Sequence, residues 1–200
     1  MVQGELFGVT DLRLTLEERR LVFENERFRA YSDTLSYGKG VACNYLTIAP
    51  KVNVAKVTGV AVLPIVEDKV GLLRIYRHPV GGFSWEIPRG FVDKDGVKKS
   101  ALRELWEETG LICKASSLKP LATVTPDSGV LAAKVQLFVA LNCQRSVGFK
   151  PRELGHKSFR LFDFKEVSRM IKQGEIEDSY TIIAYYTWVC ERKLLGAALG

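Results

Sequence analysis

The chain has 200 residues, of which 46% are hydrophobic and 26% charged, so it can build one soluble domain of ordinary size or a compact domain with an added subdomain. Its net charge of +6 agrees with an anionic small molecule as ligand, whereas the scattered basic residues argue against a nucleic-acid surface. No apolar run approaches the roughly 20 residues that span a bilayer, so we expect no membrane segment.

The cysteines and the N-terminus indicate a compartment. The four cysteines lie far apart and form no CxxC pair, which argues against a zinc site and against a disulfide framework. The first eleven residues contain acidic side chains and no apolar core, so we expect no signal peptide. The resulting prediction is a reducing, cytoplasmic location.

The first quarter of the chain has the pattern of antiparallel strands. Two extended runs, residues 20–24 and 27–35, are joined at Asn25-Glu26, a plausible hairpin turn, and a third run covers residues 41–49. We therefore predict an N-terminal β subdomain over residues 1–55. It has few apolar residues for a domain of its own, so it should pack on the rest of the chain, on a second subunit, or on both.

Residues 56–200 alternate between strand-like and helix-like segments. The strand-like segments cover residues 57–66, 70–77, 84–87, 121–125, 132–141 and 158–162. The helix-like segments cover residues 97–109, 165–172 and 179–193. Residues 142–156 are polar and are predicted to form a long exposed loop. This alternation predicts a mixed α/β domain in which helices cover a sheet.

The helix predicted over residues 97–109 has one apolar face and one acidic face. Ala101, Leu102 and Leu105 form the apolar face, which suits a core. Glu104 and Glu108 stack on the other face, with Glu107 beside them, and Gly110 ends the helix. Three crowded carboxylates repel one another unless water screens them or a hard cation neutralises them.

Residues 103–111 (Arg-Glu-Leu-Trp-Glu-Glu-Thr-Gly-Leu) resemble the second half of the signature box of the Nudix hydrolases at every fixed position. The box reads Gly, five residues, Glu, seven residues, then Arg-Glu-aliphatic-any-Glu-Glu-any-Gly-aliphatic. The first half departs from it, because counting back from Arg103 puts Asp95 in the place of the first Glu, with only four residues between Gly90 and Asp95 instead of five. Either Asp95 or Asp93 is then left to brace Arg103.

The resemblance implies a Nudix α/β/α sandwich with a mixed sheet, and a magnesium site on the helix. Glu104, Glu107 and Glu108 are the implied carboxylate ligands, and the backbone carbonyl of Arg89 is a further one. Mg²⁺ suits such a set because it prefers oxygen ligands and keeps several waters; Mn²⁺ is an alternative. Glu107 and the bracing Arg103 are also implied to take part in catalysis.

A second resemblance concerns the subgroup. Trp85-Glu86-Ile87-Pro88-Arg89-Gly90 is similar to the Glu-aliphatic-Pro-Ala-Gly segment of ADP-ribose pyrophosphatases and related nucleoside-diphosphate-sugar hydrolases. In that subgroup an Arg at the position of Arg77 contacts substrate phosphates. Pro126, sixteen residues after Gly110, is similar to a Pro that starts a loop beside the substrate.

The same subgroup exchanges its N-terminal strands across a two-fold dimer, so the resemblance implies a homodimer. An N-terminal aromatic residue or Arg there stacks on the base of the nucleotide. Phe28, Arg29 and Tyr31 are the candidates in this chain, with core packing preferred for Phe28. Arg29 is therefore a predicted substrate-binding residue.

The base that deprotonates the attacking water is assigned to Glu153, the one carboxylate within residues 142–156. Related hydrolases often carry their base on such a loop. Glu107, Glu108 and His156 remain alternatives.

The expected function is Mg²⁺-dependent hydrolysis of a nucleoside diphosphate derivative, with ADP-ribose first and AMP plus ribose 5-phosphate as products. GDP-mannose or another nucleotide-sugar is the alternative substrate. An alternative of another class is a non-hydrolytic Nudix-fold module that binds a nucleotide and regulates, motivated by the shortened box. The expected partner is a small-molecule nucleotide-sugar, with neither nucleic acid nor membrane.

Overall fold

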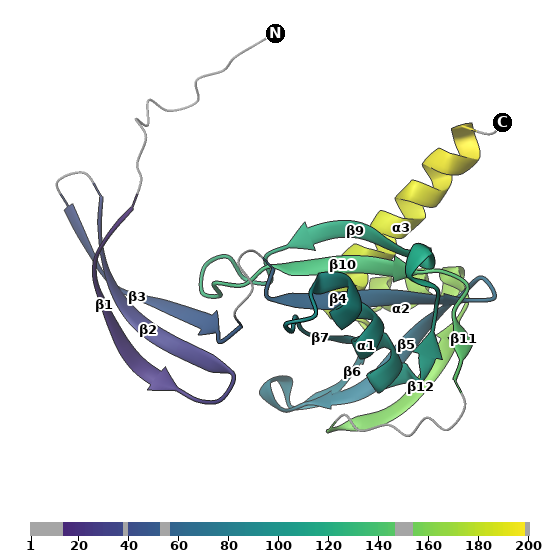
Figure 1. Cartoon of the computed structure of the whole chain (residues 1–200). Helices are drawn as coiled ribbons and strands as arrows, with labels where there is room; N and C mark the ends of the chain where they lie inside the picture. Colours follow the sequence, from purple (N-terminus) through teal and green to yellow (C-terminus); the bar gives the residue numbers. More distant parts are fainter. Residues whose placement is uncertain (1–13, 38–39, 53–56, 147–153, 199–200) are drawn as a thin grey trace, which may run out of the picture. The chain divides into compact units, whose positions relative to one another are not determined.

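The computed structural model describes residues 14–37, 40–52, 57–146 and 154–198 (Figure 1). The chain divides into two compact units. The first unit contains residues 1–51 together with residues 127–132, which come to it from the middle of the chain. The second unit contains residues 52–126 and 133–200.

The first unit is a three-stranded antiparallel sheet in the order β1-β2-β3. Its strands are β1 (Thr15–Glu24), β2 (Phe28–Tyr37) and β3 (Gly40–Pro50). The turn between β1 and β2 forms at Asn25, whose side-chain oxygen accepts hydrogen bonds from the backbone N–H groups of Arg27 at 2.8 Å and Phe28 at 2.7 Å. An Asn at this place satisfies the turn with its own side chain, as the sequence predicted.

Residues 130–132 run beside β3 and complete the first unit. The backbone N–H of Ile48 donates to the carbonyl of Val130 at 2.8 Å, and the N–H of Ala132 donates to the carbonyl of Ile48 at 2.9 Å. Ile48 and Leu131 pair as a parallel bridge. A segment that is flanked in sequence on both sides by residues of the second unit therefore belongs to the first unit in space.

The second unit is built on a seven-stranded mixed sheet whose main path is β12-β5-β4-β10-β9, with β6 paired to β5 and β7 to β4. Strand β10 runs parallel to β4, and the other pairs are antiparallel. The strands are β4 (Gly59–Val66), β5 (Lys69–Arg77), β6 (Gly82–Glu86), β7 (Arg89–Phe91), β9 (Leu118–Val124), β10 (Val135–Ala140) and β12 (His156–Phe162).

Helices cover both faces of this sheet, with α1 (Val97–Thr109) in front of it and α3 (Ser179–Ala198) behind it in Figure 1. Strand β4 shows why, because its side chains alternate between two cores. Val60 and Val62 pack with Ala101 and Leu105 of α1. The intervening Ala61 and Leu63 pack in a second core that includes side chains of α2 (Phe164–Lys172) and α3. The predicted α/β sandwich with a mixed sheet is confirmed.

Helix α1 begins and ends where the sequence predicted. Gly110 stops it with a left-handed backbone (φ 71°), and its N–H donates to the carbonyl of Trp106 at 2.9 Å. Glycine takes this conformation without the steric cost of a Cβ. The helix therefore delivers its last two turns, and the carboxylates on them, at a fixed place beside the sheet.

The predicted exposed loop over residues 142–156 is wrong at its start. Gln144–Arg145 form β11, which pairs antiparallel with β8 (Leu111–Ile112), and Cys143 is buried. The N–H of Cys143 donates to the carbonyl of Ile65 at 3.0 Å. Strands of two residues are too short to leave a periodic pattern in the sequence.

Among the described helices, none combines the length and the apolar character needed to cross a membrane.

Candidate active site

Three glutamates occupy the last two turns of α1, where the helix dipole opposes negative charge and the last turn carries no basic residue. Glu104 is 8% exposed and Glu108 is 4% exposed, so the acidic face predicted from the sequence is in large part buried. Burying carboxylates costs free energy unless hydrogen bonds or cations compensate them. Their placement breaks a local rule of helix stability, which is typical of a functional site.

Arg103 compensates part of this charge. Its guanidinium bonds the carboxylates of Glu104 at 2.8 Å, Glu107 at 2.7 Å and Asp93 at 2.9 Å, and it donates to the carbonyl of Phe91 at 3.1 Å. Of the two candidates to brace Arg103, the structure brings Asp93 into contact. Burial alone would lower the pKa of Arg103, but the surrounding carboxylates outweigh it and raise the pKa.

Asp93 is held in its charged form by the turn before α1. The backbone N–H of Asp95 donates to Asp93 Oδ1 at 2.8 Å, and the Ser100 hydroxyl lies 3.1 Å from the same oxygen. The pKa of Asp93 is lowered, first by the Asp95 N–H, which outweighs the opposing effect of burial, and further by Arg103 and Ser100. Asp95 thus helps the brace through its backbone and leaves the ion pair to Asp93.

Strand β7 lies directly against the acidic face. The backbone N–H of Arg89 donates to Glu108 Oε2 at 3.0 Å. A Cβ added to Gly90 would lie 2.0 Å from Glu104 Oε1, so only glycine leaves room for that carboxylate. The lack of room explains the glycine at position 90, and both contacts place the Arg89 carbonyl on the strand that borders the glutamates.

The donor set consists of hard carboxylate oxygens, which suit Mg²⁺ or Mn²⁺ in kind. Within residues 14–37, 40–52, 57–146 and 154–198, however, no three acidic, His or Cys side chains converge closely enough to hold an ion by themselves. Mg²⁺ commonly takes only one or two carboxylates and fills its other positions with water and phosphate oxygens. The residues therefore fit an ion that completes its shell with substrate.

A second cluster surrounds Glu86, whose side chain is almost fully buried. We call it the arginine cluster: Arg77, Glu86, Arg89 and Asp178. Arg77 Nε and Nη2 bond the two Glu86 oxygens at 3.2 and 2.7 Å, and Arg89 Nη2 bonds Glu86 Oε2 at 2.9 Å. Arg89 Nη1 bonds Asp178 at 2.9 Å. Two guanidinium groups thus balance two carboxylates.

Asp178 fixes the arginine cluster to the start of α3. Its Oδ2 accepts hydrogen bonds from the backbone N–H of Thr181 at 2.9 Å and from the Thr181 hydroxyl at 2.7 Å, which is a helix N-cap. Thr181 Oγ1 in turn accepts the N–H of Ile87 at 3.0 Å. The Arg89 guanidinium also lies 4.9 Å from the centre of the Tyr180 ring, within the range of a cation–π contact.

The two clusters meet at Arg89, whose side chain belongs to the arginine cluster and whose N–H binds Glu108. Sequence reasoning missed this junction, because it placed Glu86 within a motif and predicted no contact between Arg89 and Asp178. One signal could have revealed it. Glu86 is a carboxylate between Trp85 and Ile87 in an extended, mainly apolar segment, and such a residue must be paired when buried.

The remaining predicted residues lie elsewhere. Arg29 is on β2 of the first unit, where it pairs with Glu24 at 3.2 Å. Pro126 is half-buried just after β9. Glu153 lies outside the described residues. His156 opens β12, and its Nδ1 is buried with no hydrogen-bond partner among the described residues.

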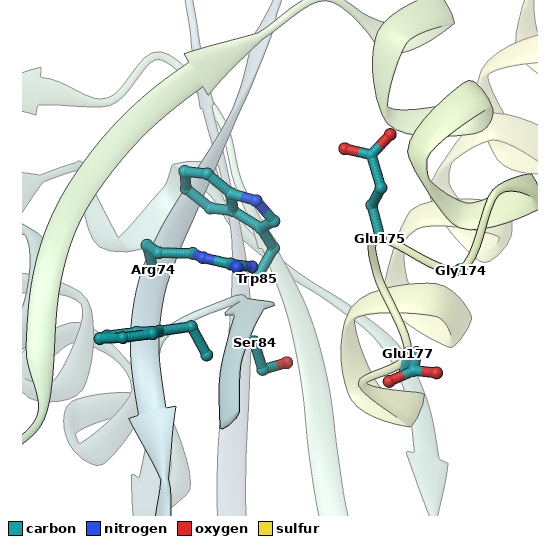
Figure 2. Close-up of a pocket in the computed structure, with 7 residues that line it drawn as sticks. Arg74, Ser84, Trp85, Gly174, Glu175 and Glu177 are labelled. Carbon is teal, nitrogen blue, oxygen red and sulfur yellow. The ribbon is translucent and has the colours of Figure 1, made fainter. Parts of the chain in front are cut away.

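A pocket of about 200 Å³ opens beside β5 and β6. It is lined by Arg74, Phe83, Ser84, Trp85, Gly174, Glu175 and Glu177. The Arg74 guanidinium lies 5.3 Å from the Trp85 ring centre and 5.8 Å from that of Phe83, while Glu175 and Glu177 come from the segment that precedes α3 (Figure 2). A stacked cation and carboxylates on one pocket suit a polar ligand that carries both hydroxyl and anionic groups.

Comparison with known proteins gives one family match. A model of the NUDIX domain matches residues 55–185. The methanol dehydrogenase activator of Bacillus methanolicus is 31% identical over 132 residues, which are 62% of this chain and 68% of that protein.

Two further relatives are described as hydrolases. An uncharacterised Nudix hydrolase of Schizosaccharomyces pombe is 34% identical over 91 residues, 43% of each chain. The ADP-sugar pyrophosphatase of Mus musculus is 33% identical over 73 residues, 34% of each chain, so each match spans less than half of the hydrolase. A crystal structure of an ADP compounds hydrolase has a TM-score of 0.75, covering 95% of this chain and 98% of that one, at 18% identity, which shows a shared fold.

Proposed function

Because the chain belongs to the Nudix family and is a Nudix hydrolase, we propose that it hydrolyses the pyrophosphate bond of an ADP-sugar, with ADP-ribose as the preferred substrate. The products are then AMP and ribose 5-phosphate. The observation that carries the proposal is the junction at Arg89, where a buried acidic cluster and a cluster of two arginines share one short strand. A pyrophosphate needs both, because its charge must be neutralised and a water must be activated beside it.

The acidic cluster is the proposed site of a divalent metal ion, Mg²⁺ first and Mn²⁺ second. Glu104, Glu107 and Glu108 would hold it together with the carbonyl of Arg89. When bound, the ion would neutralise phosphate charge and lower the pKa of a bound water. Arg103 fixes two of these carboxylates relative to each other, since it bonds both Glu104 and Glu107.

The arginine cluster is the proposed phosphate-binding part. Arg77 and Arg89 present planar guanidinium groups, which suit bidentate contact with phosphate oxygens. Glu86 holds both groups in one place, because it accepts hydrogen bonds from each. Pro126 and, from the first unit, Arg29 remain predicted contacts to the rest of the substrate.

The pocket in Figure 2 is our candidate for the part of the substrate beyond the diphosphate. Its lining includes Ser84 and Trp85, the residues that precede Glu86 along β6. The carboxylate of Glu177 can accept hydrogen bonds from sugar hydroxyls, and Arg74 can bind an anionic group. The similarity to an ADP-sugar pyrophosphatase supports this class of substrate.

Glu153 remains the proposed general base, with Glu107, Glu108 and His156 as alternatives. A general base contributes about 10²- to 10⁴-fold to a rate. Replacing Glu153 by Gln should therefore lower kcat by about 10²-fold or more. An unchanged kcat would transfer the role to one of the alternatives.

The proposal is tested by incubating the full chain with ADP-ribose, other ADP-sugars and GDP-mannose, with Mg²⁺ or Mn²⁺, and measuring the released nucleoside monophosphate. We expect AMP release from ADP-ribose to be fastest, and to stop when a chelator removes the metal. Faster release of GMP from GDP-mannose would replace ADP-ribose by the alternative substrate.

A second candidate is a nucleotide-binding module that regulates another protein without hydrolysis. It is favoured by the similarity to a protein described as an activator of methanol dehydrogenase, and by the box that is one residue short. Tight binding of an ADP-sugar without turnover, under every metal condition, would support this candidate and reject the hydrolase proposal.

We also propose a cytoplasmic homodimer in which the first unit supplies the interface. The supporting observation is a set of exposed apolar side chains in this unit: Leu14, Leu16, Leu21, Val22, Phe23, Tyr45 and Leu46. Apolar patches exposed in one chain often mark contacts between chains. Light scattering coupled to size-exclusion chromatography should give twice the chain mass, and a monomer at all concentrations would contradict the dimer.

A further inference from the structure

Two cysteines that are thirty positions apart in the sequence face each other in the second unit. Strands β8 and β11 pair antiparallel with Leu111 opposite Arg145 and Ile112 opposite Gln144. Continued by one step, this register puts Cys113 opposite Cys143. Both side chains pack in the core on the α1 side of the sheet, Cys143 buried and Cys113 half-buried.

The backbone hydrogen bonds show which kind of antiparallel pair the cysteines form. The N–H of Ser146 donates to the carbonyl of Gly110 at 2.8 Å, so Gly110 and Ser146 are opposite each other at a hydrogen-bonded position. Such positions alternate along an antiparallel ladder. Cys113 and Cys143 therefore fall at a non-hydrogen-bonded position, and the N–H of Cys143 accordingly donates elsewhere, to Ile65.

This position suits a disulfide. The Cα atoms of a non-hydrogen-bonded pair lie about 4.5 Å apart, which falls within the range of about 4.4–6.8 Å seen in disulfides. Both cysteines are free thiols in this structure. A bond between them would thus join sulfurs whose strands are already paired, without separating the strands.

The two thiols have different surroundings. Cys143 donates its Sγ–H to the carbonyl oxygen of Ala140, with 3.2 Å between sulfur and oxygen. Its interaction with the Cys113 sulfur, and then burial, raise the pKa of Cys143 far above its ordinary value. The same interaction lowers the pKa of Cys113, against the smaller effect of burial. Cys113 is both the more accessible thiol and the one that ionises first, which makes it the reactive partner.

We propose that Cys113 and Cys143 form a reversible disulfide when the protein meets a peroxide. The Cys113 thiolate attacks one oxygen of hydrogen peroxide, the O–O bond breaks, and Cys113 becomes a sulfenic acid while hydroxide leaves. Cys143 sulfur then attacks the Cys113 sulfur, the S–O bond breaks, and the thiol proton of Cys143 joins the leaving hydroxide as water. Two thiols and one peroxide give one disulfide and two waters, and two electrons pass from sulfur to oxygen.

The disulfide would tie together the strands at the end of α1. Ser146, three residues after Cys143, donates through its N–H and its hydroxyl to the carbonyl of Gly110, and it accepts a hydrogen bond from the Trp106 indole N–H at 3.1 Å. The bond would close a loop of about thirty residues that includes β9 and β10. Closing such a loop constrains the unfolded chain, so oxidation should stabilise the second unit.

The test is oxidation of the full chain with stoichiometric hydrogen peroxide, followed by alkylation of free thiols under denaturing conditions and peptide mass mapping. We expect a peptide pair joined through Cys113 and Cys143 that separates after reduction. The Tm should rise by roughly 5–10 °C on oxidation and return to its starting value with a reductant. The Cys190→Ser variant, which removes an exposed cysteine of α3, is the matched control and should behave like the parent.

Two variants separate the proposal from general thiol damage. Cys143→Ser should leave Cys113 without its resolving partner, so peroxide should drive Cys113 on to sulfinic acid with no rise in Tm. Cys113→Ser should leave Cys143 unmodified at the same dose. The proposal would be overturned if the parent protein retained both thiols while Cys190 was oxidised, or if the cross-linked peptides contained any other pair of cysteines.

Discussion

The two units of this chain differ most in what they bury. Every fully buried apolar side chain of the described residues lies in the second unit, on one or the other face of its sheet. In the first unit, the one described side chain that is fully buried is charged, Asp33, and β1 is exposed along its whole length. The second unit has the core of an independent domain, and the first has a sheet held together by hydrogen bonds and ion pairs.

This difference indicates which unit can hold reacting groups in fixed positions. The second unit places carboxylates on a helix whose other face is locked in a core, so their positions depend on Leu105 and Ala101 as well as on Arg103. The first unit lacks such a support. We therefore expect it to contribute through surface, by binding a second copy, and the second unit to contribute the reacting groups.

The largest expected effect is on turnover. Replacing Glu104 by Gln removes a carboxylate charge from the proposed metal site, which should lower kcat by about 10³-fold or more. Glu18→Gln, at an exposed carboxylate of β1, is the matched control and should leave kcat within about two-fold, as for most surface changes. Initial rates of AMP release, with circular dichroism to verify folding, measure the contrast. Equal losses of kcat in Glu104→Gln and Glu18→Gln would contradict the assignment of the reacting groups to the second unit.

The next effect is on stability. Leu105→Ala deletes a fully buried side chain from the core under α1 and should lower the free energy of unfolding by about 2–5 kcal/mol. Leu21→Ala, on β1 where the side chain is 49% exposed, should cost no more than about 0.5 kcal/mol in the monomer. Urea unfolding measures both. A large loss for Leu21→Ala that grows with protein concentration would show that the side chain is buried in a dimer.

A smaller effect on turnover is expected at the junction. Arg89→Met keeps the length of the side chain but removes the bonds to Glu86 and Asp178. Because Arg89 both positions the cluster and is a proposed phosphate contact, its loss should lower kcat or metal affinity by at least the roughly 10- to 100-fold typical of positioning residues. The control is Arg192→Met, which removes an exposed pair with Asp68 at 3.5 Å. Unchanged kcat and metal titration in Arg89→Met would mean that the side chain has no part in positioning.

Substitution of a residue that lines the pocket should change KM rather than kcat. Glu177→Gln keeps the shape of the side chain and weakens its acceptance of sugar hydroxyls, so KM for ADP-ribose should rise about 3- to 10-fold, the equivalent of one modest hydrogen bond. Inhibition by inorganic pyrophosphate or by ADP, neither of which carries the terminal ribose of ADP-ribose, should be unaffected. A fall in kcat without a change in KM would move the pocket's role away from ground-state binding.

The smallest expected effect is a loss of stability of the first unit at low pH. The guanidinium of Arg19, which bonds both oxygens of Asp33 at 2.8 Å, lowers the pKa of that carboxyl, aided by the Thr47 hydroxyl and opposed by burial. A carboxyl group whose pKa is lower in the folded than in the unfolded state stabilises the fold. This stabilisation is complete at pH values above the unfolded pKa of about 3.9, and it is lost as the pH falls through the folded pKa. Below about pH 4, the sheet of the first unit should therefore open first.

Hydrogen exchange resolves this prediction by unit. Peptides of β2 should lose protection below about pH 4 before peptides of β4 and β10 do. Asp33→Asn should remove the pH dependence in β2 and lower its protection at neutral pH. Simultaneous loss of protection in both units would contradict the assignment to Asp33.

The sequence by itself determined the helix that carries the glutamates, the strands of the main sheet other than β7, and the family. These features are local: residues 97–109 repeat with helical periodicity and end at a glycine, and the box is a run of fixed spacings. The sequence also indicated the hairpin at Asn25, where the Asn side chain accepts the backbone hydrogen bonds of the turn. Local rules sufficed because the residues concerned interact with close neighbours in the chain.

Only the tertiary structure decided which distant groups meet. Glu86 and Asp178 are joined by Arg89 across ninety residues of sequence, residues 127–132 belong to the first unit, and Cys113 comes opposite Cys143 through a pair of two-residue strands. Contacts between residues so far apart in the chain leave no recurring spacing in the sequence that would reveal them. They follow from the packing of a sheet between two layers of helices, which brings each strand end beside residues that the chain reaches much later.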